Sequence, residues 1–254
     1  MKVILTSWMG GSDKVDGKRI PGLLSNQNGC LDIIRAFWPE KVFAGVGSGA
    51  RVLMICANPE DHEKNDSLLY CFRQALPMSG LPVASVDMCD DRNTQITNEI
   101  SQMDVIILTG GHVPTQNMFF RKIGLKEKLG SFGGLLLAWS AGSMNCAGMV
   151  YAGPELPGEA SDPGFLRWIP GLGLTDINIF PHFSQLRDEV IDGFRMVDDI
   201  AFADSRTHEI IALNDGSFIV IDNGEQTLYG EAYRIRNGKL KKICENGESL
   251  EIAS

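Results

Sequence analysis

Short apolar runs rich in β-branched residues alternate along most of the chain with polar stretches of helical periodicity. Such runs predict buried strands, because a strand that is covered on both faces has no polar side. Strands that alternate with helices predict an α/β fold with a doubly wound, mostly parallel sheet and helices on both of its faces. The predicted strands lie within residues 3–6, 51–57, 82–88, 104–111, 134–140 and 177–183.

Two of the intervening stretches carry signals for the start of a helix. Asp66 precedes the helical pattern SLLYCFRQAL and is predicted to be its N-cap. Thr94 is predicted to open a second helix, TQITNEISQM. In a sheet of this kind, ligands bind beyond the carboxyl ends of the strands, so the loops that follow the strands are the places to look for a site.

The pattern changes after about residue 208, where short strands are joined by turn sequences. Asn-Asp-Gly (214–216) and Arg-Asn-Gly (236–238) are both typical of β-hairpins. We therefore predict antiparallel strands at the edge or rim of the sheet, as a C-terminal β-hairpin extension at about 209–254. No internal repeat marks a second unit, so the prediction is one domain over residues 1–254.

Composition and charge exclude several classes of partner. The formal net charge of −9 argues against nucleic acid and anionic membranes, which need a basic surface. No stretch approaches the roughly 18 apolar residues of a membrane span, and the N-terminal apolar run is too short for a signal peptide. The six cysteines form no C-x-x-C pair, so we expect free thiols and neither a metal nor a cofactor. The expected location is cytoplasmic.

One predicted strand ends in a serine that is surrounded by small residues. In LLLAWSAGSMNCAG (135–148), Ser140 lies between a strand and a segment able to start a helix. A sharp strand-to-helix turn of this kind is a nucleophile elbow, and small residues such as Ala138, Ala141 and Gly142 let the chain turn there. The Ala141 amide would face a developing oxyanion. The alternative is a serine that only caps a helix.

A nucleophilic serine needs a base, and His182 is favoured because it follows the strand INIF at the same sheet edge. His112 follows the turn Gly110-Gly111 and is expected to contact substrate, while the Gly111 amide is a candidate second oxyanion donor. The two other histidines, His62 and His208, lie in polar loops. Three carboxylates after the serine could orient the base, and spacing alone does not choose among them: Glu155, Glu159 and Asp162.

Three stretches together resemble the serine peptidases of the peptidase E (aspartyl dipeptidase) and cyanophycinase group. They are ILTGGHVPTQNMF (107–119), LAWSAGSMNCAG (137–148) and INIFPHFSQLRDE (177–189). The resemblance implies a fold like that of class I glutamine amidotransferases, with Ser140 as nucleophile and His182 as base. It also implies Glu155 as the triad acid, within an acidic-x-Pro segment, and Glu159 as the alternative acid.

The chain departs from the family pattern at two places that bear on specificity. His112 stands where the family's glycine turn usually continues with Asn-Thr, so this wall of the site is rebuilt. Arg187 resembles the arginine that would recognise an N-terminal aspartate, but a surface ion pair with Asp188 or Glu189 explains it equally well. The stretch GMVYAGPELPGEASDPGFLRW (148–168) is predicted to form a lid or substrate loop.

The sequence therefore predicts a serine peptidase that hydrolyses small peptides, in the manner of an aspartyl dipeptidase, through a Ser-His-Glu triad. Its alternatives are an isoaspartyl peptidase of the cyanophycinase type and a catalytically silent binding protein with the same fold. The partners expected are a small peptide substrate and, as one option, a second copy of the chain in a homodimer.

Overall fold

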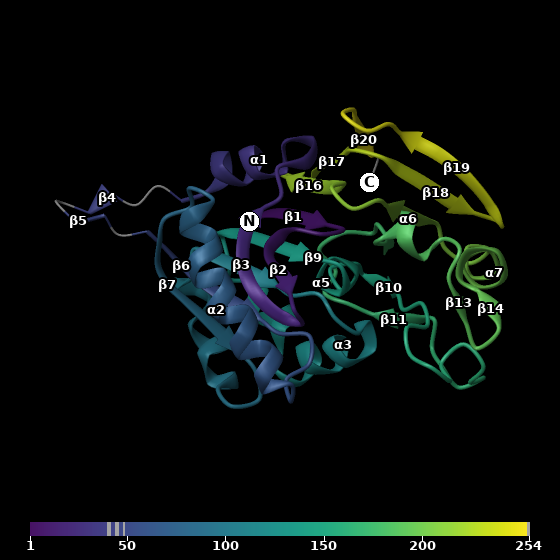
Figure 1. The fold of residues 1–254 in the computed structure, drawn as a ribbon, viewed down its shortest axis with the longest axis horizontal. Coiled ribbons are helices and arrows are strands. Elements are labelled where there is room, and N and C mark those ends of the chain that lie inside the picture. Colours follow the sequence, from purple (N-terminus) through teal and green to yellow (C-terminus); the bar gives the residue numbers. More distant parts are fainter. Residues whose placement is uncertain (40–41, 44–45, 48, 253–254) are drawn as a thin grey trace.

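The computed structural model describes residues 1–39, 42–43, 46–47 and 49–252, and its centre is an eight-stranded sheet (Figure 1). The strand order is β20-β17-β16-β1-β9-β8-β6-β7. The neighbouring strands β1, β9, β8, β6 and β7 run parallel to one another, which confirms the predicted α/β class. Their bounds are β1 Lys2–Thr6, β6 Ala50–Ile55, β7 Val83–Cys89, β8 Val105–Leu108 and β9 Leu135–Trp139.

Three antiparallel strands continue this sheet beyond β1, as the change of pattern after residue 208 predicts. They are β16 (Phe218–Asp222), β17 (Glu225–Tyr229) and β20 (Ser249–Ile252). β16 lies directly beside β1, with Ile4 opposite Val220. Part of the C-terminal segment is therefore built into the main sheet, and only the last two residues of that segment, 253–254, lie outside the described residues.

A second, four-stranded sheet has the order β12-β15-β18-β19. Its strands are β12 (Ile179–Phe180), β15 (Ile210–Leu213), β18 (Ala232–Arg236) and β19 (Lys239–Cys244). The Arg-Asn-Gly turn joins β18 and β19 as a hairpin, as predicted. The hairpin predicted at Asn-Asp-Gly is wrong, because β15 pairs within this sheet while β16 pairs with β1 and β17. That turn passes the chain from one sheet to the other.

The helices flank the sheet, and their starts correct two of the predictions. The long helix α2 begins at His62 with Asp61 as its cap, since the Asp61 side chain accepts a hydrogen bond from the Lys64 amide; Asp66 lies inside the helix. The segment from Thr94 is a 3-10 helix, η2. The bounds are η1 Gln27–Gly29, α1 Cys30–Phe37, α2 His62–Met78, η2 Thr94–Gln102, α3 Val113–Lys122, α4 Leu125–Leu129, α5 Ala141–Met144, α6 Phe183–Leu186, η3 Met196–Ala201 and α7 Phe202–Asp204.

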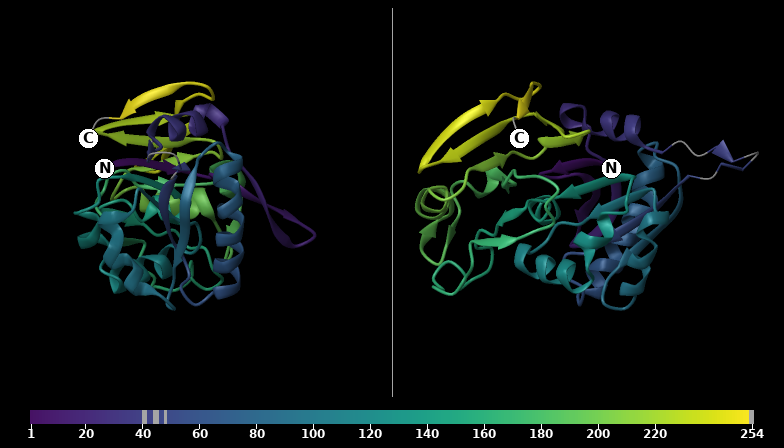
Figure 2. Two further views of the ribbon diagram at one scale, coloured as in Figure 1. Left: turned by 90° about the vertical axis from the view of Figure 1, so that its left-hand side faces the viewer. Right: turned by 180° about the vertical axis from the view of Figure 1, so that it is seen from behind.

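Short hairpins decorate this framework. The first, formed by β2 and β3, projects from the body of the molecule, as the left view in Figure 2 shows. The pair β10 and β11 carries between its strands the loop predicted as a lid. The bounds are β2 Gly10–Val15, β3 Lys18–Leu24, β4 Val42–Phe43, β5 Val46–Gly47, β10 Met149–Tyr151, β11 Trp168–Pro170, β13 Val190–Ile191 and β14 Phe194–Arg195.

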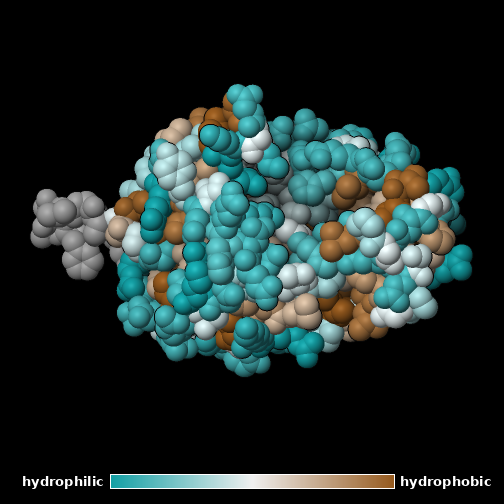
Figure 3. Space-filling model, turned by 60° about the horizontal axis from the view of Figure 1, so that its bottom comes forward, coloured by the Kyte–Doolittle hydropathy of each residue, from teal (hydrophilic) through white to brown (hydrophobic). Residues whose placement is uncertain are grey.

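Hydrophobic residues on the surface are spread unevenly. On the face shown in Figure 3 much of the surface is hydrophilic, and hydrophobic residues gather mainly in its right-hand part. Figure 1 places β13, β14 and the loop between β10 and β11 at that end of the molecule. The exposed large hydrophobic residues of these segments are Leu156, Leu166, Val190 and Phe194. The decorating hairpins are therefore less completely covered than the central sheet.

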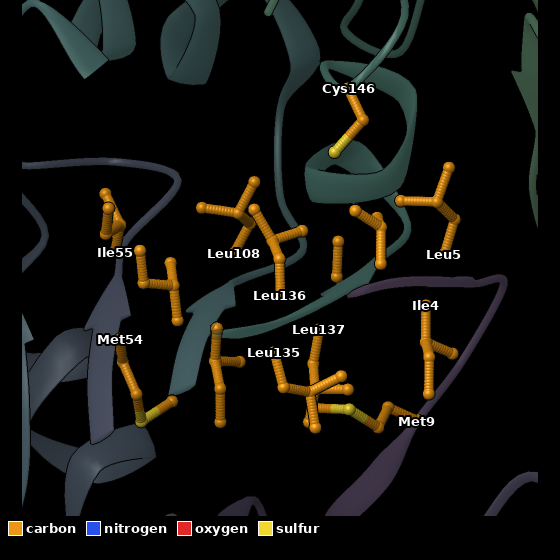
Figure 4. Packing of buried hydrophobic residues seen from close by; sticks show 14 of the residues in the cluster. Ile4, Leu5, Met9, Met54, Ile55, Leu108, Leu135, Leu136, Leu137 and Cys146 are labelled. Atoms are coloured by element: carbon orange, nitrogen blue, oxygen red, sulfur yellow. The ribbon is translucent and has the colours of Figure 1, made fainter. Parts of the chain in front are cut away.

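The main core lies on both faces of the parallel strands. Figure 4 shows Leu136 of β9 on the side of Cys146, and Leu135 and Leu137 on the opposite side, near Met9. This alternation follows from the two-residue period of a strand, and it explains why β9 is apolar at every position up to the turn. The cysteines are free and buried, as predicted. Among the described residues, no helix is long and apolar enough to cross a membrane.

Candidate active site

Ser140 occupies a strained turn between β9 and α5. Its backbone dihedrals are φ 50° and ψ −120°, outside the regions that non-glycine residues usually adopt. Such a conformation costs about 1–3 kcal/mol and persists only where the surroundings impose it. Here the Ser140 amide donates to the Thr6 carbonyl of β1 over 3.0 Å, and the Ser143 hydroxyl donates to the same carbonyl over 2.9 Å. The strand-to-helix elbow predicted from the sequence is therefore present.

Glycines around the elbow are required by close packing. A Cβ atom on Gly142 would lie 2.8 Å from the backbone carbon of Leu108 in β8, closer than real Cβ contacts come. A Cβ on Gly110 would lie 3.1 Å from the Cβ of Ser140 and closer still to the Trp139 ring. The turn after β8 thus lies directly against the serine, and Ala141 is fully buried at the first position of α5.

His182 lies at the end of β12 and also has an unusual backbone, with φ 54° and ψ 31°. Its amide donates to the Ser7 hydroxyl over 2.8 Å, and its ring Nδ1 lies 2.7 Å from Oδ1 of Asp215. Within the described part of the chain, Nε2 makes no hydrogen bond, and neither does the Ser140 hydroxyl. Hydrogen bonds between catalytic groups often form only when substrate binds. The ring is thus anchored through one nitrogen and open at the other.

Asp215 is fixed from several sides in the turn that leads from β15 to β16. Its Oδ1 also accepts from the Ser7 hydroxyl over 2.8 Å, and its Oδ2 accepts from the side-chain amide nitrogen (Nε2) of Gln185 over 2.7 Å. Burial alone would raise the pKa of this carboxyl, but the hydrogen bond and charge of His182, with the bonds from Ser7 and Gln185, outweigh burial and lower the pKa. Asp215 therefore stays ionised beside the imidazole.

The predicted bond between Glu155 and His182 is not formed, and Asp215 was not among the acids predicted. Glu155 lies in the loop after β10, where its carboxyl faces the Val113 backbone rather than the histidine. Protein atoms crowd that carboxyl although the residue keeps solvent-accessible surface, and the loss of water raises its pKa to about 7. The overlooked signal was an aspartate in a glycine turn directly after the apolar strand IIAL.

The alternative acid, Glu159, contacts a different histidine. Its Oε1 lies 2.8 Å from Nε2 of His112, and its Oε2 accepts from the amides of Glu155 and Leu156 over 2.8 and 2.9 Å. The other ring nitrogen of His112, Nδ1, lies 2.7 Å from the Thr115 hydroxyl. His112 and Glu159 thus tie the loop after β10 to the start of α3.

Two cavities meet at Ser140 and His182, which line both. The larger has a volume of about 470 Å³ and the smaller about 280 Å³. Gly111, the predicted oxyanion donor, lines the smaller cavity. Arg187 is exposed and lines neither, so the arginine expected to bind an aspartate side chain does not face the site.

The larger cavity is walled by the loop after β10, by the segment around His182 and by β13. That loop lies within the stretch 148–168 predicted as a lid or substrate loop, a role that stays a prediction. The other lining residues of the larger cavity are Met144, Gly153, Pro154, Glu155, Pro157, Phe180, Pro181, Leu186, Glu189, Val190, Ile191 and Met196. Those of the smaller cavity are Trp8, Gly10, Ser12, Arg19, Lys64, Leu68, Gly110, Gly111 and Trp139.

One group of side chains elsewhere has the donor types of a metal site. The ligand atoms of His62, Asp90 and Asp91 lie within 4.8 Å of one another. However, Arg92 bonds both oxygens of Asp90 over 3.1 and 3.0 Å through Nε, and His62 Nε2 lies 2.6 Å from Asp91. These internal contacts account for the cluster, and we assign no cation to it.

A serine in a strained elbow beside a histidine held by a carboxylate is the arrangement of serine-type hydrolases. The chain belongs to peptidase family S51, whose family model matches residues 43–229, and it is a serine-type peptidase. The fold is similar to a 1.5 Å crystal structure from Listeria monocytogenes EGD-e of a protein provisionally named peptidase E. That likeness has a TM-score of 0.55 and 16% identity, and covers 95% of this chain and 98% of the other. No curated protein matches the chain.

Proposed function

We propose that this serine peptidase is an exopeptidase of short peptides, with Ser140, His182 and Asp215 as its triad. The observation that carries the proposal is the 2.7 Å contact between His182 Nδ1 and Asp215, at a ring that lines the same cavities as Ser140. The proposed triad differs from the Ser-His-Glu triad expected from the sequence, because its acid follows the histidine in the chain.

The proposed roles of the three residues follow from which of their atoms already make hydrogen bonds and which are free to react. Ser140 Oγ attacks the carbonyl carbon of the scissile bond, and its proton passes to His182 Nε2. Asp215 holds Nδ1–H and stabilises the imidazolium. The C–N bond then breaks as His182 returns the proton to the leaving amine. In the second half, His182 takes a proton from water as the water oxygen attacks the acyl carbon, and the bond to Ser140 Oγ breaks as His182 gives the proton back to that oxygen. The Gly111 and Ala141 amides are the proposed donors to the oxyanion.

The size of the cavities supports short substrates. Volumes of about 470 and 280 Å³ are in the range that holds small molecules, and the loop after β10 walls one side. We also propose that residues 1–254 act as one domain, since Asp215 from the C-terminal part faces the site built around Ser140. A cytoplasmic location and a homodimer stay predictions from the sequence.

The test is the release of free amino acids from purified protein incubated with α-linked dipeptides, among them Ala-Leu, Leu-Ala and Asp-Leu, and with β-aspartyl-leucine. We expect turnover of α-linked dipeptides and a loss of at least about 10⁴-fold in the Ser140→Ala variant. Turnover of the β-aspartyl substrate alone would favour the isoaspartyl alternative. Absence of any turnover, with no covalent labelling of Ser140 by a fluorophosphonate, would identify a silent protein of the same fold.

A further inference from the structure

The two cavities that meet at Ser140 carry opposite charges. Glu155 and Glu189 are the charged residues in the wall of the larger cavity, apart from the shared His182, and apolar side chains make up most of the rest. Arg19 and Lys64 line the smaller cavity, which has no acidic residue in its described wall. A molecule that spans Ser140 therefore meets a negative apolar chamber on one side and a positive chamber on the other.

Lys64 is available to a ligand in the smaller cavity. A Cβ placed on Gly111 would lie 3.9 Å from its Nζ, so this ammonium group lies beside the proposed oxyanion turn. Nζ makes no ion pair or hydrogen bond to the described residues. Arg19 donates from one terminal nitrogen to the Ser12 hydroxyl over 2.8 Å, which orients its guanidinium within the same wall. Two cations without a carboxylate partner in the described part of the chain favour an anionic group of the substrate.

In the larger cavity, Glu155 offers a carboxylate to a positively charged group of a ligand. Its carboxyl faces the Val113 backbone and has no cationic partner among the described residues. The residue is exposed, yet protein atoms around the carboxyl raise its pKa to about 7; the charge of Glu159 adds to this rise and a hydrogen bond from the Val113 backbone opposes it. Glu189, exposed at the same wall, also makes no ion pair with any described residue. Both residues keep solvent-accessible surface, so their carboxylates are open to a positively charged ligand group that enters the chamber.

We propose that the site binds short peptides with two free ends in a single orientation. The N-terminal residue lies in the larger cavity with its ammonium group near Glu155 and Glu189, and the C-terminal carboxylate lies at Arg19 and Lys64. This inference rests on the proposed function and specifies its substrates.

The same chamber sets the preferred side chain of the N-terminal residue. Met144, Phe180, Leu186, Ile191 and Met196 offer apolar contacts, and no Lys or Arg belongs to the described wall. An aspartate side chain there would approach two glutamates without a compensating cation. We therefore infer that leucine-like residues are accepted and that aspartate is disfavoured, in contrast to the aspartyl specificity expected from the family resemblance.

Four dipeptide substrates with matched changes test each end: Leu-Ala, N-acetyl-Leu-Ala, Leu-Ala amide and Asp-Ala. Blocking the amine or the carboxylate removes one charge without changing the scissile bond. We expect kcat/KM for Leu-Ala to exceed that of each blocked peptide by roughly tenfold or more, the usual effect of losing a charge-assisted hydrogen bond. It should also exceed that of Asp-Ala, whose side chain would approach two glutamates.

Two variants test which cavity binds which end of the peptide. Lys64→Gln should lower kcat/KM for Leu-Ala roughly tenfold and leave Leu-Ala amide unchanged, while Glu155→Gln should lower it for Leu-Ala and leave N-acetyl-Leu-Ala unchanged. Glu225→Gln is the matched control, because Glu225 is exposed at the start of β17 and lines neither cavity. It should change neither substrate.

The outcomes separate this inference from the proposed function. Labelling of Ser140 by a fluorophosphonate, together with a preference for Asp-Ala or equal rates on blocked and free peptides, would overturn the inference and leave the triad standing. Labelling without hydrolysis of any of the four peptides would also overturn it. Absence of both labelling and hydrolysis would overturn the proposed function, and the inference with it.

Discussion

The site contains two histidine–carboxylate pairs that look alike in distance but differ in what they leave free. His182 lies 2.7 Å from Asp215, and His112 lies 2.8 Å from Glu159. The second ring nitrogen of His112 is occupied by the Thr115 hydroxyl, whereas that of His182 has no partner among the described residues. A base must accept a proton on an open nitrogen, so of these two histidines it is His182 that we propose for that role.

The two histidine–carboxylate pairs also differ in what holds them in place. Asp215 and His182 are bonded to Ser7, a residue that directly follows β1 in the central sheet. Glu159 is bonded to amides of its own loop, which forms a wall of the larger cavity. The first pair is thus anchored to the framework and the second fastens a loop to α3. A histidine and an acid in contact therefore indicate catalysis only when the geometry leaves a nitrogen open.

The largest expected effect comes from removing each histidine in turn. His182→Ala should lower kcat by at least about 10⁴-fold, because the nucleophile loses its base. His112→Ala should lower kcat by less than about tenfold, since it removes only a loop tether. Steady-state hydrolysis of the preferred dipeptide measures both. Equal losses in the two variants would remove the distinction between the pairs.

Substituting the two acids, Asp215 and Glu159, should give the same contrast as substituting the two histidines, with smaller losses of activity. Asp215→Asn should lower kcat by about 10²–10⁴-fold, because an amide neither holds the correct tautomer nor stabilises the imidazolium. Glu159→Gln should act mainly on KM, by a few-fold, through the loop that lines the larger cavity. Steady-state kinetics of both variants measure kcat and KM side by side. A loss of kcat in Glu159→Gln alone would mean that Glu159, and not Asp215, supports the catalytic histidine.

Stability should depend on pH through Asp215. Its pKa in the folded protein is lowered, so its stabilising contribution is present above the ordinary value of about 3.9 and is lost as pH falls through the lower folded value. Urea unfolding of the wild type and Asp215→Asn should therefore differ more at pH 6 than at pH 2.5. A difference that grows toward low pH would contradict the hydrogen bonds that Asp215 accepts from Ser7 and Gln185.

Glu155 should show the opposite pH dependence of stability. Its pKa rises from 4.5 to about 7 on folding, so the folded state keeps a proton that the unfolded state has lost in this interval, and stability falls as pH rises through it. Glu155→Gln removes that loss, and its stability relative to the wild type should be higher at pH 8 than at pH 4. Urea unfolding at the two pH values measures this, and an unchanged difference would mean that the carboxyl is fully hydrated.

The fold was predictable where a local pattern determines it. Apolar runs located the parallel strands, including β9 and β12, because a buried strand has no polar face. The Asn-Asp-Gly turn led to a wrong hairpin, since turn chemistry fixes a reversal of the chain but not which partner each flanking strand pairs with. Here β15 and β16 pair in different sheets, and that choice depends on contacts far apart in the sequence.

The site was predictable to a similar extent. Ser140 and His182 follow strands, and the ends of strands carry recognisable residues. The proposed triad acid, Asp215, could not be chosen by spacing, because the His182–Asp215 contact depends on how the second sheet lies beside the first. The acidic-x-Pro segment drew attention to Glu155, yet its carboxyl faces the Val113 backbone. Sequence order cannot reveal the direction in which a loop side chain points.

The rate at which a fluorophosphonate labels Ser140, followed by mass spectrometry, tests the triad most directly, since it depends on neither substrate nor specificity. We expect labelling at Ser140 in the wild type, nearly the same rate in Glu159→Gln and Glu155→Gln, and a rate at least about 10²-fold lower in Asp215→Asn. Full labelling of Asp215→Asn together with loss in either glutamate variant would show that the acid lies in the loop after β10, and would contradict Asp215 as the third member of the triad.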